Sequence, residues 1–284
     1  MSKPWILVSP ASRGIGHALT RHLLRTTTVP VFATARSHPR DVRASILDGL
    51  FASSPPRSAG DEDEALASAS ERFHIAQVDL THEPTLRSAS AEASRLYPPK
   101  THHLRLAFAL PGILYPEKSP QEIDYSHALH TFQVNTLGPL LLIKHFSPFL
   151  PRKSTVISPE PLFTSCPTPR HATWLTTSAR VGSTADNKLG GWYTYRASKA
   201  AVTSLTKTFD LHLRTRCADA AAAIAYHPGT VRTGLSKEYW GRVPAEQLFT
   251  PEYAVERMLE VLRTRRMDED RGRCWDHRGE EVLP

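Results

Sequence analysis

Tyr195 and Lys199 are the residues of this sequence whose types and spacing could carry out proton transfer. They lie four positions apart in residues 190–201 (GGWYTYRASKAA), and on a helix such a pair shares one face. A nearby ammonium favours the phenolate and lowers the pKa of a phenol from its usual value of about 10. A phenol tuned in this way can pass a proton near neutral pH. Because an ordinary amphipathic helix can show the same spacing, the rest of the chain must decide between the two interpretations.

A turn with two glycines follows the first apolar run of the chain. Residues 5–8 (WILV) predict a buried strand, residues 9–16 (SPASRGIG) a turn, and residues 17–26 a helix. This order is typical of the unit that holds a phosphate group at a helix N-terminus, where free backbone N–H groups point at the ligand. A simple tight turn would also explain Gly14 and Gly16, so this signal is weak alone.

Two arginines indicate which dinucleotide such a turn would bind. The second expected strand, residues 29–35, ends at Arg36, where dinucleotide-binding folds meet the adenosine ribose. An acidic residue there would bind the 2′-hydroxyl group, whereas an arginine suits a 2′-phosphate. Arg36 and Arg13 together would grip that phosphate, although both could also be plain surface residues. We therefore expect NADP(H) as the cofactor.

Expected strands and helices alternate along the remaining chain. This alternation predicts an α/β fold, a Rossmann-type doubly wound parallel sheet of about seven strands with helices on both faces. We expect one domain over residues 1–284, with a mobile insertion at 52–70 and a proline-rich loop at 151–171. Pro139 and Pro148 should bend or divide a long helix. The other expected strands are 72–78, 104–110, 172–177, 220–226 and 272–275, and the other expected helices are 41–51, 82–97, 125–150, 192–217 and 251–263.

Composition limits the other function classes. The net charge is +7, but the basic residues are scattered, so nucleic-acid binding is disfavoured. The three cysteines lie far apart without a CxxC motif, which fits a reducing compartment and no metal. No apolar run approaches 18 residues, and the first residues lack a secretory signal. We expect a cytoplasmic protein that binds no membrane.

Taken together, the motifs resemble those of the short-chain dehydrogenase/reductase superfamily over nearly the whole chain. The family's opening TGxxxGxG turn corresponds to residues 9–16, its helical asparagine to Asn135, and its YxxxK pair to Tyr195 and Lys199. Its PGxVxT loop corresponds to residues 228–233. Residues 178–199 are most similar to the C-factor-like and sniffer-like branch of carbonyl reductases.

The resemblance implies hydride transfer between NADP(H) and a small carbonyl or alcohol substrate, with Tyr195 as general acid/base. Lys199 would lower the phenol pKa and hold the nicotinamide ribose, and Asn135 would hold a water in a proton relay. A serine would hydrogen-bond the substrate oxygen. We favour Ser178, which directly follows a strand, over Ser183, whose distance from Tyr195 is nearer the commonest spacing. The implied cofactor-binding residues are Ser9, Ser12, Arg13, Gly14, Ile15, Gly16, Arg36, Asp79, Leu80, Gly112, Asn135, Tyr195, Lys199, Pro228, Gly229, Val231 and Thr233.

Two departures from the family pattern favour an alternative function. Pro10 replaces the first glycine of the turn, and residues 109–112 (ALPG) replace the family's NNAG. Proline lacks an N–H and fixes φ, so the turn could grip a pyrophosphate less well. The alternative is a nucleotide-binding regulator of the same fold with little turnover.

The sequence says least about the substrate pocket and the oligomeric state. Loops after strand carboxyl ends line the crevice of such folds, which nominates residues 236–248 as a lid. The helices 125–150 and 192–217 often form dimer faces in relatives, so we expect a homodimer or a homotetramer. The expected pocket walls are Leu114, Tyr115, Trp192, Tyr239 and Trp240.

Overall fold

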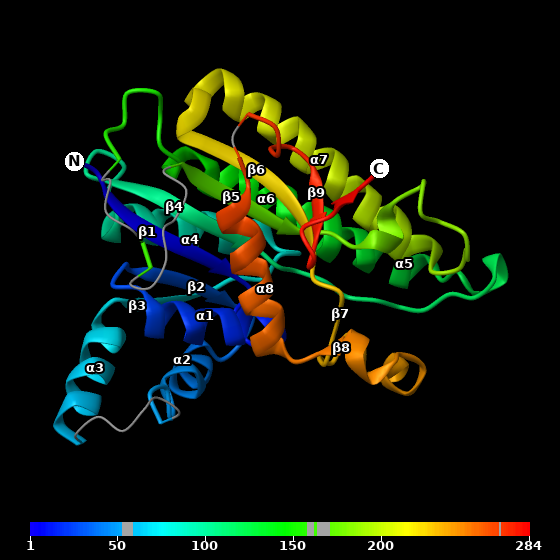
Figure 1. Ribbon diagram of the computed structural model, residues 1–284, viewed down its shortest axis with the longest axis horizontal. Coiled ribbons are helices and arrows are strands. Elements are labelled where there is room, and N and C mark those ends of the chain that lie inside the picture. The colour runs from blue at the N-terminus through cyan, green and yellow to red at the C-terminus, as the bar shows by residue number, and fades with distance from the viewer. Residues whose placement is uncertain (53–58, 158–161, 164–170, 267) are drawn as a thin grey trace.

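An eight-stranded sheet forms the centre of the protein (Figure 1). The computed structural model describes residues 1–52, 59–157, 162–163, 171–266 and 268–284. The strand order is β10-β9-β6-β5-β4-β1-β2-β3, and β10 alone pairs antiparallel to its neighbour in this sheet of the described residues. The doubly wound fold predicted from the sequence is therefore confirmed. The strands are β1 Lys3–Ser9, β2 Val31–Ala35, β3 Phe73–Gln77, β4 His102–Ala109, β5 Ala172–Thr177, β6 Ala221–His227, β9 Cys274–Asp276 and β10 Glu281–Val282.

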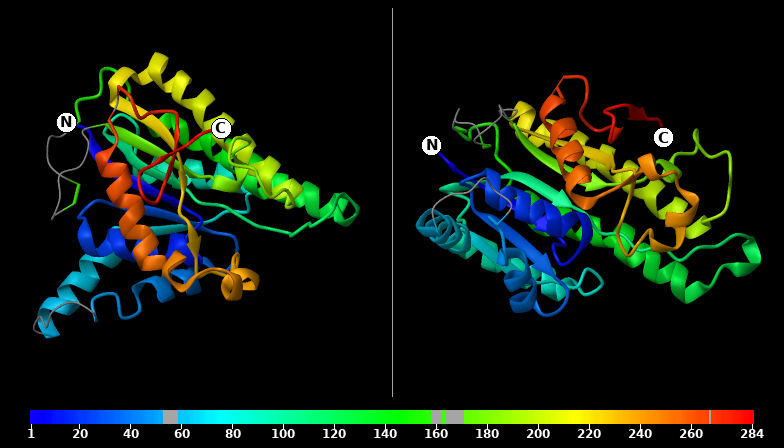
Figure 2. Two further views of the ribbon diagram at one scale, coloured as in Figure 1. Left: turned by 45° about the vertical axis from the view of Figure 1, so that its right-hand side comes forward. Right: turned by 60° about the horizontal axis from the view of Figure 1, so that its bottom comes forward.

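Helices cover both faces of the sheet, so the central strands are buried on both sides and read as continuous apolar runs. One core cluster joins the sheet to α1 (Gly14–Thr26), α2 (Pro39–Leu47) and α8 (Pro251–Thr264). The other joins it to α4 (Glu83–Leu96), α6 (Gly138–Phe146) and α7 (Tyr193–Cys217). Figure 2 shows the two helix layers from further angles.

The helix expected over residues 125–150 is divided at Asn135. α5 (Tyr125–Phe132) leads into a π-helical turn, Gln133–Leu137, and then into α6. Pro139 is the second residue of α6 and follows the π-turn without a break in the helical backbone, and Pro148 lies in the 3₁₀ turn after α6. The irregularity we expected at Pro139 thus falls at a π-turn that ends two positions before it, a feature frequent at functional sites.

Two segments expected to be irregular are only partly described. Most of the described part of the expected insertion at 52–70 is the helix α3 (Ala59–Glu71), while residues 53–58 lie outside the described residues. Two acidic residues in its first turn, Asp61 and Glu62, suit the positive end of a helix. Residues 158–161 and 164–170 of the expected proline-rich loop also lie outside the described residues. The single-domain organisation stays a prediction.

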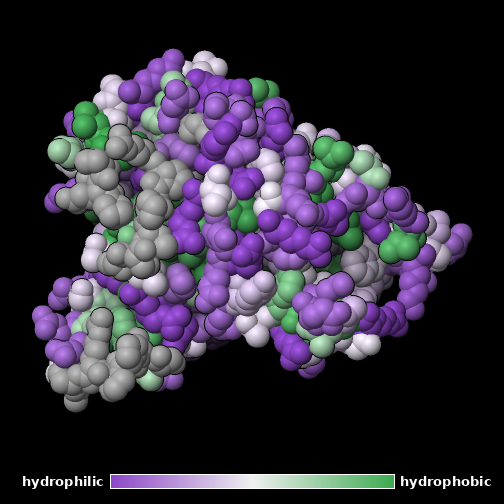
Figure 3. Space-filling model, viewed as in Figure 1, coloured by the Kyte–Doolittle hydropathy of each residue, from purple (hydrophilic) through white to green (hydrophobic). Residues whose placement is uncertain are grey.

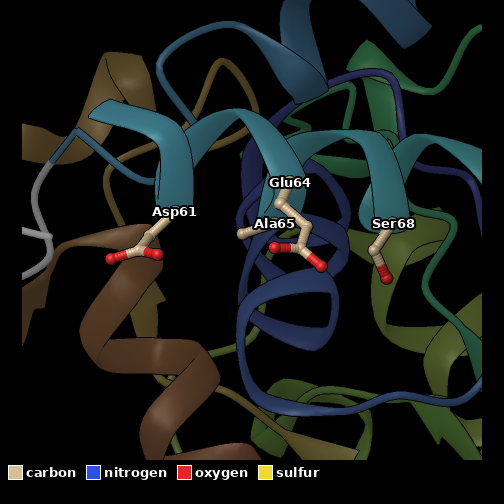
Figure 4. Close-up of a pocket in the computed structure, with 4 residues that line it drawn as sticks. All are labelled: Asp61, Glu64, Ala65 and Ser68. Atoms are coloured by element: carbon tan, nitrogen blue, oxygen red, sulfur yellow. The ribbon is translucent and has the colours of Figure 1, made fainter. Parts of the chain in front are cut away.

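A hollow beside α3 lies far from the catalytic pair. Asp61, Glu64, Ala65 and Ser68 line it, all pointing from the same side of α3 (Figure 4). α3 is at the opposite end of the molecule from the first turn of α7 (Figures 1 and 2). This hollow is therefore separate from the site built below.

The segment after β6 carries the expected lid. β7 (Thr230–Val231) and β8 (Leu248–Phe249) form a small second sheet, and two 3₁₀ turns, Lys237–Arg242 and Ala245–Gln247, lie between them. Hydrophilic residues cover most of the face seen in Figure 3, with hydrophobic residues in small groups. Across the described residues, no helix is both long and apolar enough to span a membrane.

Candidate active site

The carboxyl ends of four neighbouring strands bring the predicted site residues together. β6, β5, β4 and β1 are adjacent in the sheet and parallel, so the segments that leave them meet at one edge. These segments carry the glycine turn after β1, Gly112 after β4, Ser178 after β5, and Pro228 to Thr233 after β6. In doubly wound sheets, this edge is where ligands bind.

The glycine turn fits a phosphate group in spite of Pro10. Ala11 N donates to Thr34 O at 2.8 Å, and the Ser9 and Thr34 hydroxyl oxygens lie 2.7 Å apart, so β2 holds the turn. Gly14 has φ +57°, in the left-handed region that favours glycine. The first turn of α1 has neither a side-chain cap nor an acidic residue. Its free N–H groups can therefore take an anionic ligand.

The predicted cofactor residues from different strands lie close together. A Cβ added to Gly14 would lie 3.0 Å from Thr233 Cγ2, so the turn after β1 meets the segment after β6. A Cβ added to Gly112 would lie 3.9 Å from Lys199 Nζ. A larger side chain at either glycine would therefore project toward a residue that we expect to bind the cofactor.

Replacing Gly16 with alanine is expected to destabilise the protein by about 3 kcal/mol, since an added Cβ would lie 2.0 Å from the Pro10 carbonyl oxygen and would force the backbone to move. Thermal unfolding checks this expectation, with Gly241→Ala as the control because nothing lies within 4 Å of a Cβ at that position. Equal melting temperatures for the two variants would show that the turn is not held against α1 as described.

Tyr195 and Lys199 lie in the first turns of α7 and are both buried, with 7% and 2% of their surface exposed. Lys199 Nζ donates to Thr177 O at 2.9 Å and to Pro111 O at 3.2 Å, and it lies 5.9 Å from the centroid of the Tyr195 ring. The ammonium is therefore held between the segments that leave β4 and β5, beside the phenol.

Burial changes the pKa values of both groups. It lowers the pKa of Lys199 to about 8 and raises the pKa of Tyr195 to about 12. For Tyr195 this is opposite to the direction that we expected from the lysine. The physical reason is that loss of water disfavours the phenolate, while the lysine donates its hydrogen bonds to two carbonyl groups. The Tyr195 phenol is therefore protonated at neutral pH.

Asn135 connects the segment after β4 to α7. Its Oδ1 accepts from Ile113 N at 2.8 Å, and its Nδ2 donates to Ile113 O at 2.9 Å and to Ser198 Oγ at 3.1 Å. Ser198 Oγ in turn donates to Tyr195 O at 2.8 Å. The asparagine side chain thus links Ile113, in the segment after β4, to Ser198 in α7.

Both candidate serines are engaged by the protein itself. Ser178 Oγ donates to Lys199 O at 3.0 Å and lies 3.0 Å from Thr203 Oγ1. Ser183 Oγ accepts from Asp186 N at 3.0 Å. Either hydroxyl would have to turn away from its present partner to reach a substrate, so the choice between them stays a prediction.

The residues expected at the adenosine end lie in the turn after β1 and at the carboxyl ends of β2 and β3. Arg13 and Arg36 are both exposed, and neither forms an ion pair within the described part of the chain. Asp79 Oδ1 accepts from Thr81 N at 2.9 Å and Thr81 Oγ1 at 2.7 Å, which turns it toward its own loop. Leu80 packs on Gly138 at the start of α6. Two free guanidinium groups therefore remain at this end.

Aromatic side chains stand beside Tyr195. The Trp192 ring lies 6.1 Å from the Tyr195 ring and 4.9 Å from the Tyr239 ring, both edge-on. Tyr115 instead stacks on His127 at 4.0 Å, and Trp240 Nε1 donates to Ser236 Oγ at 2.9 Å. Trp192 and Tyr239 thus form an apolar wall next to the phenol, joining α7 to the expected lid.

Three positioning residues were not predicted from the sequence. Ser198 forms hydrogen bonds with Asn135 and Tyr195. Arg196 donates to the carbonyl oxygens of Gly190, Gly191 and Val181. Glu117 binds the first turn of α7. Ser198 lies three positions after Tyr195 on the same helical face, a spacing that could have identified it. Glu117 contacts Thr194, 77 positions away, and no local pattern signals that contact.

The fold and the site define a class of protein. A doubly wound parallel sheet, an uncapped helix N-terminus after a glycine turn, and a buried Tyr–Lys pair at the strand carboxyl ends are together typical of dinucleotide-binding Rossmann-type proteins.

Comparison with known proteins narrows this class. The chain is 30% identical over 161 residues to C-signal of Myxococcus xanthus, covering 57% of this chain and 81% of that protein. It is 27% identical over 257 residues to 1-hydroxy-2-glutathionyl-2-methyl-3-butene dehydrogenase of Rhodococcus sp. (strain AD45), covering 90% of this chain and 89% of that protein. No family model matches the chain.

Solved structures share the fold over the full length of both chains. The NADPH-bound carbonyl reductase from chicken fatty liver superposes with a TM-score of 0.74 at 24% identity, covering 100% of each chain. Carbonyl reductase Sniffer of D. melanogaster superposes with a TM-score of 0.75 at 20% identity, again covering 100% of each chain. The chain belongs to the short-chain dehydrogenase/reductase superfamily, as its motifs predict.

Proposed function

We propose that this protein is an NADP(H)-dependent oxidoreductase that transfers a hydride between the nicotinamide and a small carbonyl or alcohol substrate. The observation that carries the proposal is the buried Tyr195 phenol with Lys199 beside it at the carboxyl edge of the sheet. Burial raises the pKa of Tyr195 to about 12, so the phenol carries at neutral pH the proton that carbonyl reduction requires for the substrate oxygen.

The protein residues have distinct roles in this reaction. The bound cofactor supplies the hydride. Tyr195 donates its proton to the substrate oxygen, and the Lys199 ammonium stabilises the phenolate that remains. Asn135 keeps the segment after β4 in register with α7. The wall formed by Trp192 and Tyr239 suits an apolar or aromatic carbonyl compound.

Ser178 is our proposed partner of the substrate oxygen, because it directly follows β5 beside Lys199. The Ser178 hydroxyl would give up its hydrogen bond to the Lys199 carbonyl oxygen and donate to the substrate oxygen instead. Ser183 is the alternative, and single alanine variants of the two serines would separate them by their turnover.

The choice of NADP(H) is supported by the two free arginines and by relatives. The chicken carbonyl reductase was solved with NADPH, and a short-chain dehydrogenase/reductase from Burkholderia multivorans with NADP. The strongest support in this chain is that Arg36 and Arg13 stand at the expected 2′-phosphate end with no acid at the end of β2.

Replacing Arg36 with aspartate is expected to weaken NADPH binding by about tenfold or more and to reverse or abolish the preference over NADH. The physical reason is the loss of a charge-assisted contact, roughly 1.5–3 kcal/mol, and the gain of a repelling carboxylate. Calorimetric titration with each cofactor measures the effect, with Arg40→Asp on α2 as a charge-matched control. If the unaltered protein already binds NADH as tightly as NADPH, the arginine pair does not select the cofactor.

The second candidate function is a nucleotide-binding regulator with little turnover. The observation in its favour is that both candidate serine hydroxyls are bound within the protein. A panel of carbonyl compounds, followed by NADPH absorbance together with calorimetric binding of NADPH, separates the two functions. Turnover of any carbonyl supports the oxidoreductase, and binding with no turnover across the panel supports the regulator.

The cellular setting stays part of the proposal. We propose a cytoplasmic homodimer or homotetramer without nucleic-acid or membrane partners. Exposed apolar side chains on α5 and just after it, Tyr125, Leu129 and Leu137, support association of copies through this side. Sedimentation of the purified protein would test it.

A further inference from the structure

We propose that Glu117 is a positioning residue for the reaction and that it fixes the first turn of α7, which carries Tyr195. This inference rests on the proposed function. Glu117 lies in the extended segment between β4 and α5, and only 3% of its surface is exposed. A carboxylate buried to this degree is costly unless donors satisfy its oxygens.

Both carboxyl oxygens of Glu117 are bound by one residue of α7. Thr194 N donates to Oε2 at 2.8 Å, and the Thr194 hydroxyl donates to Oε1. The backbone also takes part, because Trp192 N donates to Glu117 O at 2.6 Å. Glu117 therefore binds Trp192, which directly precedes α7, and Thr194, which is the second residue of α7.

α7 has no N-cap of its own that could replace this contact. Its N-cap position is Trp192, which has φ +50° and makes no side-chain capping hydrogen bond. Serine, threonine, aspartate or asparagine usually fills this position. Among the described residues, no lysine or arginine forms an ion pair with Glu117, so the positive end of the helix is what balances the carboxylate.

The position of this contact connects it to the reaction. Thr194 immediately precedes Tyr195, and Trp192 forms the aromatic wall beside the phenol. Gly190, Gly191 and Trp192 all have positive φ, so the chain before α7 is a sharp irregular turn rather than a continuing element. Glu117 thus determines where α7 starts. It also determines how the first turn of α7 is oriented, and with it the rings of Trp192 and Tyr195. A displacement of about 1 Å at such a place can cost about a hundredfold in rate.

The test compares Glu117→Ala and Glu117→Gln with Glu122→Ala. Glu122 is a matched control, since its carboxylate lies on the same segment and accepts from Lys118 N at 2.9 Å, but within the described part of the chain it forms no hydrogen bond with α7. Hydrogen–deuterium exchange of residues 190–200 in the free protein reports the contact without any turnover. The kcat and KM for a reduced carbonyl, with the NADPH dissociation constant, report its effect on the reaction.

We expect Glu117→Ala to speed exchange in residues 190–200 and to lower kcat about tenfold to a hundredfold, with NADPH affinity unchanged. Glu117→Gln should restore most of kcat, because its amide oxygen can accept from Thr194 N. Glu122→Ala should behave as the unaltered protein in both measurements.

Faster exchange with an unchanged kcat would overturn the proposal, because the contact would then be structural only. Unchanged exchange would overturn it as well. If Glu117→Ala does not fold, Thr194→Val, which removes only the hydroxyl donor, decides by the same two criteria. An unaltered protein that turns over no carbonyl would contradict the proposed function instead, and this outcome is visible before any variant is made.

Discussion

Replacing Tyr195 with phenylalanine is expected to lower the turnover of a carbonyl substrate on the order of a thousandfold, because the phenol is the group that donates the proton. The change removes one oxygen atom and leaves the ring that packs edge-on against Trp192. In the described part of the chain the Tyr195 hydroxyl has no hydrogen-bond partner, so the fold should not weaken, and NADPH binding should stay largely intact. Steady-state kinetics, calorimetry with NADPH and thermal unfolding together measure this result.

The control for this variant is Tyr193→Phe. Tyr193 begins the same helix but is 40% exposed, so the loss of its hydroxyl should leave turnover unchanged. Equal turnover in Tyr195→Phe and Tyr193→Phe would remove Tyr195 from the reaction. A Tyr195→Phe protein that no longer binds NADPH would instead place the phenol in cofactor binding.

Replacing Lys199 with methionine is expected to lower kcat by on the order of a hundredfold to a thousandfold, because the phenolate loses its stabilising charge. Stability should also fall, by roughly 1–3 kcal/mol, since the buried carbonyl oxygens of Thr177 and Pro111 each lose a donor. The matched control is Lys207→Met, which changes an exposed lysine of the same helix. Urea unfolding and kcat measurements separate the two effects.

The pH profile of kcat gives the sharper test of Lys199. Burial lowers its pKa to about 8, so the ammonium is present below this pH and is lost above it. The ammonium is the form that stabilises the phenolate left by proton donation. Carbonyl reduction should therefore slow as the pH rises through about 8, and this step should be missing in Lys199→Met. A profile that Lys199→Met leaves unchanged would assign the titration to another group.

Strand and helix positions could be predicted from the sequence where the pattern was strong. The apolar runs before the glycine turn and before Ser178 became β1 and β5 because buried parallel strands are apolar on both faces. β10 was missed, since its two residues are too short for any periodicity. Most of the expected insertion proved to be α3, whose alanines favour a helix although few of its residues are buried.

The site was predictable to the extent that its residues lie in short motifs. Gly14, Asn135, Tyr195 and Lys199 could be named as candidates because each stands at a fixed position relative to a strand or a helix face. The pKa direction of Tyr195 was wrong, because the degree of burial is a tertiary property that spacing does not contain. Glu117 could not be found for the same reason, as its contact with Thr194 forms only when the chain folds.

The most direct test of the account uses NADPH that carries deuterium as the transferable hydrogen of its nicotinamide. With a carbonyl compound selected from the panel, we expect the deuterium on the carbon of the new alcohol, detected by mass spectrometry, and labelled alcohol formed on the order of a thousandfold more slowly when Tyr195→Phe replaces the unaltered protein. NADPH that binds tightly while no carbonyl of the panel yields a labelled alcohol would contradict the proposed reaction.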